Sequence, residues 1–175
     1  MEELVIRPAR RQELEEIWAL VGRAVVHMNQ LGNPQWGPDY PTRAFYAGDI
    51  DRGELYAALT GGALAGVACI NTSESPEYDP LPWTTVRPAM VIHRMAVDPA
   101  FQRSGVGTAF FRFAEDRARA LGLGAMRIDT YSLNNRMQGL IRRMGFTQVG
   151  TIRLHGRPLP FPCFEKSLAI PGAKE

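Results

Sequence analysis

Hydrophobic residues recur along the chain at two spacings, and the wider, helical spacing predicts four helices. The first covers residues 11–31 and ends at Gly32. Its apolar positions follow the helical period: Leu14, Ile17, Trp18, Val21, Val25 and Met28. Further helices are predicted at 42–53, 106–121 and 134–144. For the helix at 42–53, Thr42 is the predicted N-terminal cap, because its hydroxyl can accept a hydrogen bond from a free main-chain amide.

Short runs of apolar or alternating residues predict strands between these helices. Gly61-Gly62 joins two of them and is typical of a hairpin turn. The segment 72–88 contains four prolines and predicts irregular structure, as does 33–41. The predicted strands cover residues 4–8, 54–60, 63–71, 89–97, 125–130, 146–152 and 163–168. This order predicts an α/β or α+β sheet covered by helices, in a single domain of residues 1–170 with a loose tail at 171–175.

Composition narrows the class of protein. The 175 residues suit one domain, with 45% hydrophobic and 22% charged side chains, and a net charge of +2 with scattered arginines argues against a nucleic-acid partner. The cysteines, Cys69 and Cys163, have no metal-ligand spacing, so no metal is expected, and two cysteines suit a reducing compartment. The acidic start at Glu2 and Glu3 is unlike a secretion signal, and no apolar run approaches a membrane span. We therefore expect a cytoplasmic protein without a membrane partner.

The segment Gln102–Gly107 carries the clearest chemical signal. It follows the apolar run 91–97 and opens the helix predicted at 106–121, and its two glycines allow a sharp turn. Free amides at a helix N-terminus, together with the positive end of the helix dipole, form a phosphate site. Arg103 adds a cation. The amides expected to be free are those of Gly105, Val106, Gly107 and Thr108.

A dinucleotide-binding fold is one alternative for this loop. Strand, glycine turn, helix and strand form a βαβ unit, and Asp129 lies about twenty residues further on, as that motif requires. However, the third glycine position is occupied by Phe110, and the loop 98–104 is long for a motif that turns directly out of its strand. A triphosphate loop is also disfavoured, because no Gly-Lys-Ser/Thr follows the glycines.

The second alternative rests on a longer pattern. Residues 97–107, Val-Asp-Pro-Ala-Phe-Gln-Arg-Ser-Gly-Val-Gly, resemble the coenzyme A loop of the GCN5-related N-acetyltransferases (GNAT family). Asn134 and the later Met144-Gly145-Phe146 resemble the family's Asn…Gly-Phe signature at a typical distance. The resemblance covers residues 89–150 in its motifs and the N-terminal part only in the order of its elements.

This resemblance implies a fold and a cofactor. The fold is a mixed, mostly antiparallel, twisted sheet flanked by helices, with a splayed pair of central strands, and the cofactor is acetyl-CoA. The loop amides are implied to hold the pyrophosphate, and the bulged strand before the loop is implied to bind the pantetheine arm through its main chain. The implied cofactor-binding residues are Met95, Ala96, Val97, Gln102, Arg103, Ser104, Gly105, Val106, Gly107, Thr108 and Asn134.

The implied reaction is direct transfer of an acetyl group from the CoA thioester to a primary amine. It needs a donor for the carbonyl oxygen, for which the main-chain amide of Met95 is the candidate, and a base for the amine. His93 is the candidate base, since strand alternation places it on the same face as Met95, although it could instead be a structural histidine. Weaker candidates, acting through water, lie on loops: Glu77, Asp79 and His155.

One position departs from the family. The tyrosine that often protonates the leaving thiolate is replaced by Ile141. Tyr131 or Ser132 could substitute, or the thiolate could leave unaided. The departure also keeps open a non-enzymatic alternative, a CoA-binding sensor or partner domain.

The sequence says least about the acceptor. Four aromatic residues lie in loops that wall the acceptor pocket in this family, namely Trp36, Tyr40, Tyr78 and Trp83. Each ring could equally cover the edge of the core. The resemblance implies a small-molecule or peptide amine as acceptor and is compatible with a homodimer.

Overall fold

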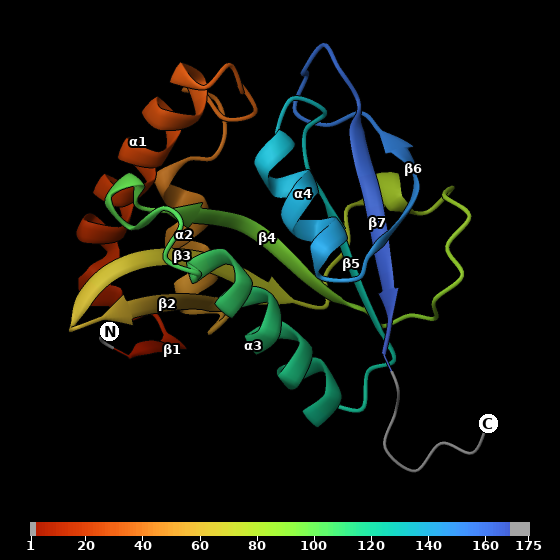
Figure 1. The fold of residues 1–175 in the computed structure, drawn as a ribbon, viewed down its shortest axis with the longest axis horizontal. Coiled ribbons are helices and arrows are strands. Elements are labelled where there is room, and N and C mark those ends of the chain that lie inside the picture. The colour runs from red at the N-terminus through yellow and green to blue at the C-terminus, as the bar shows by residue number, and fades with distance from the viewer. Residues whose placement is uncertain (1–2, 169–175) are drawn as a thin grey trace. The chain divides into compact units, whose positions relative to one another are not determined.

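The computed structural model describes residues 3–168, so the predicted tail at 171–175 lies outside the described residues. Seven strands are ordered β1-β2-β3-β4-β5-β7-β6 (Figure 1). The strands are β1 (Leu4–Pro8), β2 (Leu55–Thr60), β3 (Ala63–Asn71), β4 (Met90–Val97), β5 (Ala125–Asp129), β6 (Thr147–Ile152) and β7 (Phe161–Ser167). The helices are α1 (Leu14–Gln30), α2 (Arg43–Asp51), α3 (Val106–Ala120) and α4 (Asn135–Arg143). The short 3₁₀ turns are η1 (Arg11–Glu13), η2 (Pro76–Tyr78) and η3 (Pro99–Phe101).

The chain forms two compact units, which are described separately. The first contains residues up to 70 together with 93–110, and the second contains 71–92 together with the described residues from 111 onward. The first unit therefore contains β1, β2, almost all of β3 and the second half of β4. The second contains the start of β4 together with β5, β6 and β7.

In the first unit, β1, β2 and β3 pair antiparallel. Gly61 and Gly62 both have positive φ, +56° and +78°, which is what a tight turn between β2 and β3 requires. The hairpin predicted from the glycine pair is therefore confirmed.

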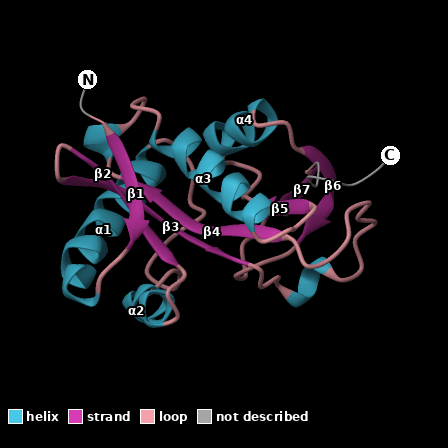
Figure 2. Cartoon of the chain, turned by 90° about the horizontal axis from the view of Figure 1, so that it is seen from below, coloured by secondary structure: helices cyan, strands magenta, loops and turns pink. Residues whose placement is uncertain are grey.

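The central strands of the first unit are covered on both faces. One face packs against α1 and α2, which lie on the same side of these strands in Figure 2. On the other face, Gly66 of β3 lies close to Val106 and Phe110 in the first turns of α3. Burial on both faces explains why β2 and β3 are near-continuous apolar runs rather than alternating ones. The core residues on the α1/α2 face include Ile17, Leu20, Val21, Tyr46, Ile50, Leu55, Ala57, Val67 and Cys69.

In the second unit, β4 begins in parallel pairing with β5, with Met90 opposite Met126. Strand β7 pairs antiparallel with β5 on one side and β6 on the other. The ring of Phe111 on α3 packs edge-on against Phe146, with ring centroids 5.6 Å apart. Lys166 of β7 donates to Glu115 of α3 and to the carbonyl of Met144, which ties both helices to the sheet.

The predicted fold class, a mixed and mostly antiparallel sheet with flanking helices, is confirmed. Three local predictions need correction. Residues 11–13 form a 3₁₀ turn before α1, and β7 begins at Phe161, two residues earlier than predicted. Thr42 precedes α2 in the extended conformation but makes no side-chain capping bond.

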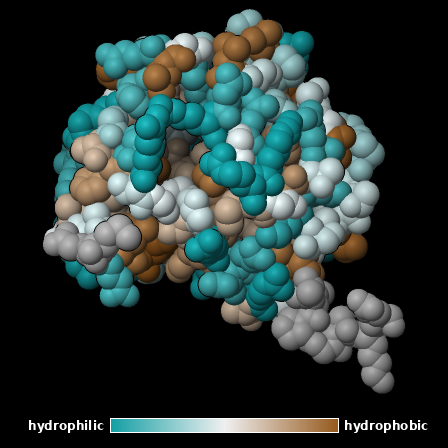
Figure 3. All heavy atoms as spheres, in the orientation of Figure 1, coloured by the Kyte–Doolittle hydropathy of each residue, from teal (hydrophilic) through white to brown (hydrophobic). Residues whose placement is uncertain are grey.

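The surface is mixed in character. On the face drawn in Figure 3, hydrophilic and hydrophobic side chains are interspersed. The exposed large hydrophobic residues among those described are scattered along the chain: Val5, Val26, Leu31, Phe45, Val86, Leu121, Leu133 and Leu159. Within residues 3–168, none of the helices combines the length and apolar character needed to cross a membrane.

Candidate functional site

The glycine loop leads from β4 into α3 through two residues in the left-handed conformation (Figure 1). Arg103 has φ +64° and Gly105 has φ +80°. Ala109 is bonded to the carbonyl of Gly105 at 2.9 Å, as in a regular first turn. By helix geometry, the N–H groups of the three preceding residues, 106–108, have no helical carbonyl to bond. The loop therefore presents a row of main-chain donors at the positive end of a 15-residue helix.

The start of this loop is anchored by Asp98. Its side chain accepts the N–H of Ala100 at 2.9 Å and pairs with Arg23 of α1 at 2.7 Å. Burial acts to raise the pKa of Asp98, but these two partners outweigh it and lower the pKa. The side chain of Gln102 folds back to the carbonyl of Val97 at 3.4 Å. Arg103, Ser104 and Gly105, by contrast, are exposed, so the tip of the loop is accessible while its base is held.

Strand β4 does not keep the alternation predicted for residues 91–97. Arg94 has φ +49°, which interrupts the extended conformation between His93 and Met95. His93, Arg94 and Met95 are all half-buried, rather than alternating between two faces. The alternation from which His93 and Met95 were placed on one face is therefore interrupted at Arg94. A single left-handed residue within a strand is typical of a β-bulge, which re-aims main-chain and side-chain groups.

The guanidinium of Arg94 is held by a fully buried carboxylate. Asp49 of α2 accepts from Arg94 Nε at 3.0 Å and from Nη2 at 2.8 Å, and it also accepts from Arg52 at 2.7 Å. Burial acts to lower the pKa of Arg94, but Tyr40 and Asp49 outweigh it and raise the pKa. The guanidinium of Arg94 therefore stays charged, and the negative charge of Asp49 is balanced by two arginines, Arg94 and Arg52.

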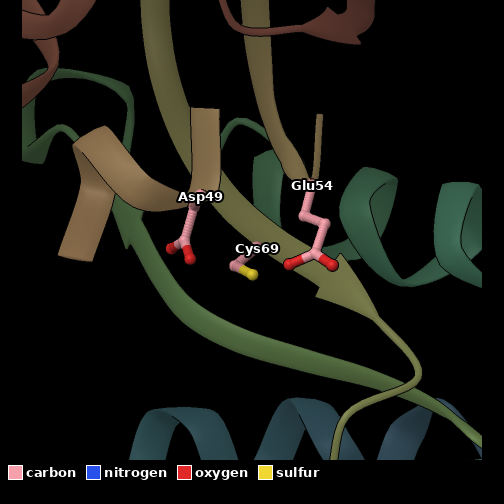
Figure 4. Close-up of side chains that lie close together, drawn as sticks. All are labelled: Asp49, Glu54 and Cys69. Carbon is pink, nitrogen blue, oxygen red and sulfur yellow. The ribbon is translucent and has the colours of Figure 1, made fainter. Parts of the chain in front are cut away.

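Asp49 also forms a cluster with Glu54 and Cys69, in which the three side chains point toward one another (Figure 4). The donor set argues against a metal ion at this cluster. The Asp49 oxygens already accept from two arginines, and Glu54 accepts from Arg52 at 3.2 Å. Burial, together with the nearby Asp49 carboxylate, raises the pKa of Cys69 to about 12, so its thiol is protonated beside these ion pairs. The cluster is better described as an arginine-binding site.

In the second unit, Tyr131 is fully buried. Its hydroxyl accepts the N–H of Leu159 at 3.2 Å, and its ring packs on Phe161 with centroids 4.9 Å apart. The hydroxyl of Ser132 donates to the carbonyl of Pro160. Ile141 of α4 is completely buried and has no chemistry to offer. Of the two predicted hydroxyl donors, Ser132 therefore donates in its bond to Pro160, whereas Tyr131 accepts in its bond to Leu159.

Asn134 caps α4. Its side-chain oxygen accepts the N–H of Met137 at 3.1 Å, which satisfies one of the free amides at that helix end. Asn134 is therefore the N-terminal cap of α4.

A second polar pair joins the buried Tyr78 to the half-buried Asp129. Its hydroxyl donates to Asp129 at the end of β5, at 2.6 Å. Desolvation raises the pKa of Asp129 to about 6, against the hydrogen bond from Tyr78, which lowers it. The pKa of the Tyr78 hydroxyl is likewise raised well above its ordinary value by burial. Neither member of this pair was assigned a catalytic role from the sequence.

The four aromatic residues predicted to line an acceptor pocket are distributed over both units. Trp36 is 5% exposed and belongs to the core of the first unit, and Tyr40 packs against that core while contacting Arg94 at 3.4 Å. In the second unit, Tyr78 is buried, and Trp83 packs on it at 5.1 Å and donates to its carbonyl. Trp36 and Tyr78 therefore contribute to the core of their respective units.

Asp49 and Arg94 are the site residues that sequence reasoning missed. They are separated by 45 residues, and neither belongs to a recognisable motif. The sequence shows only an acidic residue within the helix predicted at 42–53, and this feature is too common to be specific.

Comparison with known proteins identifies the family and the fold. The family model of the acetyltransferase (GNAT) family matches residues 23–146. A GNAT-family acetyltransferase from Streptococcus agalactiae 2603 superposes with a TM-score of 0.83, at 24% identity, over 95% of this chain and 96% of the other. For a GNAT-family acetyltransferase from Listeria monocytogenes 4b F2365 the TM-score is 0.76, at 23% identity, over 95% and 96% of the two chains. yncA from Salmonella typhimurium, solved with its cofactor acetyl-CoA, gives 0.66 at 21% identity, over 98% of each. No curated protein matches the chain significantly.

The chain therefore belongs to the GNAT acetyltransferase family, a family of N-acetyltransferase enzymes that use acetyl-CoA. The family and enzyme class predicted from the loop and the Gly-Phe signature are confirmed.

Proposed function

We propose that this protein transfers an acetyl group from acetyl-CoA to a primary amine, by direct attack of the amine on the thioester. The observation that carries the proposal is the loop that ends in left-handed Gly105 and continues directly into α3. Its main-chain donors suit the negatively charged pyrophosphate of CoA. The yncA structure, which has the same fold and holds acetyl-CoA, supports the same ligand.

In this proposal the loop from Gln102 to Thr108 binds the pyrophosphate, with Arg103 as a cation at its exposed tip. Asp98 and Arg23 hold the base of the loop, so little ordering remains to be done on binding. The main chain of 95–97 in β4 binds the pantetheine arm. In the second unit, Asn134, whose side-chain oxygen caps α4, contacts the cofactor.

The chemistry needs a proton acceptor, an oxyanion donor and a leaving thiolate. We assign the acceptor to His93, whose ordinary pKa lies near 6.5 and suits proton removal at neutral pH. The main-chain N–H of Met95 donates to the thioester oxygen as negative charge develops on it. Tyr131 protonates the departing sulfur. The amine nitrogen forms the new bond to the acetyl carbon, the carbon–sulfur bond breaks, and CoA leaves as its thiol.

Ile141 supports a second candidate, a domain that binds CoA without turnover, because the family's usual acid is replaced by a buried aliphatic residue. The two candidates differ in one measurement. Acetyl-CoA is incubated with a panel of amines, small molecules and peptide N-termini included, and free thiol is followed. Amine-dependent thiol release supports the enzyme, whereas tight calorimetric binding of CoA with no release for any amine supports the binding domain.

We further propose that the reaction takes place in the cytoplasm. Both cysteines are free and buried, which suits a reducing compartment.

A further inference from the structure

The main chain of Arg94 lies in the left-handed region, which residues with a β-carbon rarely adopt. It has φ +49° in the middle of β4, between the proposed base His93 and the proposed oxyanion donor Met95. For a residue with a β-carbon, the left-handed region is disfavoured because that carbon comes too close to the following carbonyl oxygen. Such a conformation persists only where the surroundings impose it.

The surroundings that impose it come mainly from α2. At one end of Arg94, the hydroxyl of Tyr46 donates to its main-chain carbonyl at 3.4 Å. At the other end, Asp49 binds the guanidinium through two bonds, at 3.0 and 2.8 Å. One helix therefore holds both the main chain and the side-chain tip of Arg94.

Because the Arg94–Asp49 ion pair is buried, its geometry is tightly constrained. The Asp49 side chain is fully buried, and that of Arg94 is 12% exposed. A buried carboxylate is tolerated only when it is paired and hydrogen-bonded, and a two-pronged arginine–carboxylate contact also fixes orientation. Arg52 supplies the second cation at 2.7 Å, and the ring of Phe45 lies 5.1 Å from the guanidinium carbon of Arg94. The guanidinium therefore has little freedom to move.

We propose that Asp49 is a positioning residue for acyl transfer: by holding Arg94 it keeps the left-handed main chain at position 94 and thereby aims the Met95 amide at the thioester oxygen. This inference rests on the function proposed above. The peptide between residues 94 and 95 carries that amide, so releasing Arg94 to the extended region would rotate the N–H away from its target. A misplacement of about 1 Å at such a group is enough to reduce a rate about 100-fold.

The first test compares Asp49→Asn with Asp51→Asn. Both residues lie on α2, and Asp51 forms an exposed ion pair with Arg11 at 2.8 Å, so it is a matched control for loss of one α2 carboxylate. Dissociation constants for CoA and acetyl-CoA are measured by calorimetry, because only acetyl-CoA offers the thioester oxygen. We expect Asp49→Asn to weaken acetyl-CoA about fivefold relative to CoA, the equivalent of one hydrogen bond of about 1 kcal/mol. Asp51→Asn is expected to leave the ratio at the wild-type value.

A second pair of variants separates positioning from simple stabilisation. Asp49→Asn is combined with Arg94→Gly or with Arg94→Ala, so that both double variants lack the ion pair. Glycine adopts a positive φ without strain and alanine does not. We expect the ratio of the acetyl-CoA and CoA dissociation constants to return most of the way to the wild-type value in the glycine double variant and to remain altered in the alanine one. Both variants are measured well below their unfolding temperatures. These variants decide the matter even if Asp49→Asn alone does not fold.

The outcomes distinguish this inference from the proposed function. If the wild-type protein binds neither CoA nor acetyl-CoA, the proposed function itself is wrong. Wild-type binding of both ligands, with an unchanged ratio in Asp49→Asn or equal ratios in the two double variants, would overturn the positioning role alone.

Discussion

Gly66 of β3 lies so close to the carbonyl oxygen of Ala96 in β4 that a β-carbon at position 66 would stand 2.9 Å from that oxygen. The same β-carbon would lie 3.0 Å from Val106 Cγ1, at the start of α3. A glycine is therefore required where the two strands and the helix that follows the glycine loop meet. This close approach links the packing of the first unit directly to the position of the proposed pyrophosphate site.

Gly66→Ala should disturb both stability and cofactor binding. Because main-chain atoms cannot move aside easily, we expect the free energy of unfolding to fall by about 1–3 kcal/mol, as for other overpacked sites. A displaced α3 should also weaken CoA binding several-fold. Gly22→Ala on α1 is the control, since a β-carbon there meets nothing within 4 Å, and it should leave stability equal or slightly higher. Urea unfolding and calorimetry measure the two effects, and wild-type values for Gly66→Ala would contradict the packing argument.

Gly105→Ala should weaken CoA binding through the backbone alone. Gly105 has φ +80° and no atom near its missing β-carbon, so the penalty is conformational rather than steric. Gly122, at the end of α3, has φ +71° and equally open surroundings, and it lies outside the loop. Both alanine variants should lose about 1 kcal/mol of stability, as expected for a left-handed residue with a β-carbon. Only Gly105→Ala should raise the dissociation constant of CoA, and an equal effect of the two variants would argue against a phosphate-binding loop.

His93→Ala should reduce turnover near neutral pH while leaving CoA affinity intact. Loss of a general base typically lowers the rate by about 100-fold or more. Thiol release is followed from pH 6 to 9 for wild type, His93→Ala and His27→Ala. His27 is a suitable control because its Nε2 has no hydrogen-bond partner among the described residues. Rates of His93→Ala that match wild type at every pH would exclude His93 from the mechanism.

The raised pKa of Asp129 should make the free energy of unfolding fall as the pH rises from 4 to 7. Its pKa in the folded protein is about 6, against an ordinary value of 3.8, so between these values the folded state binds more protons than the unfolded state. The stabilising contribution is therefore complete below pH 3.8 and is lost as the pH rises through 6. Asp129→Asn removes this contribution and can still accept from Tyr78. Its unfolding free energy relative to wild type should consequently rise from pH 4 to pH 7.

The measurement is urea unfolding at several pH values, and the difference between variant and wild type isolates Asp129 from other carboxylates. Asp116→Asn, at an exposed position on α3, provides the control for loss of one acid. Parallel stability profiles for Asp129→Asn and wild type would show that Asp129 does not take up a proton in this range.

Much of the fold was accessible from the sequence because its signals are local. The helical period of 11–31, the Gly61-Gly62 turn and the glycines after β4 each depend on residues within a few positions of one another. The glycine loop and its helix were predicted for the same reason, since a sharp turn followed by free helix amides is a short-range arrangement. Less accessible were the ends of elements, such as the start of β7, where tertiary pairing decides how far a strand extends.

What the sequence by itself determined is the order of elements, the phosphate-binding turn and the membership of an acyltransferase family, all of them encoded in contiguous stretches of chain. Only the tertiary structure decided the conformation of Arg94, because an arginine has no local reason to adopt φ +49° in a strand. That conformation is imposed by Tyr46 and Asp49 on a helix more than forty residues away. The same long-range contacts broke the simple alternation on which His93 and Met95 had been placed, since the direction of a side chain on a strand depends on every backbone torsion before it.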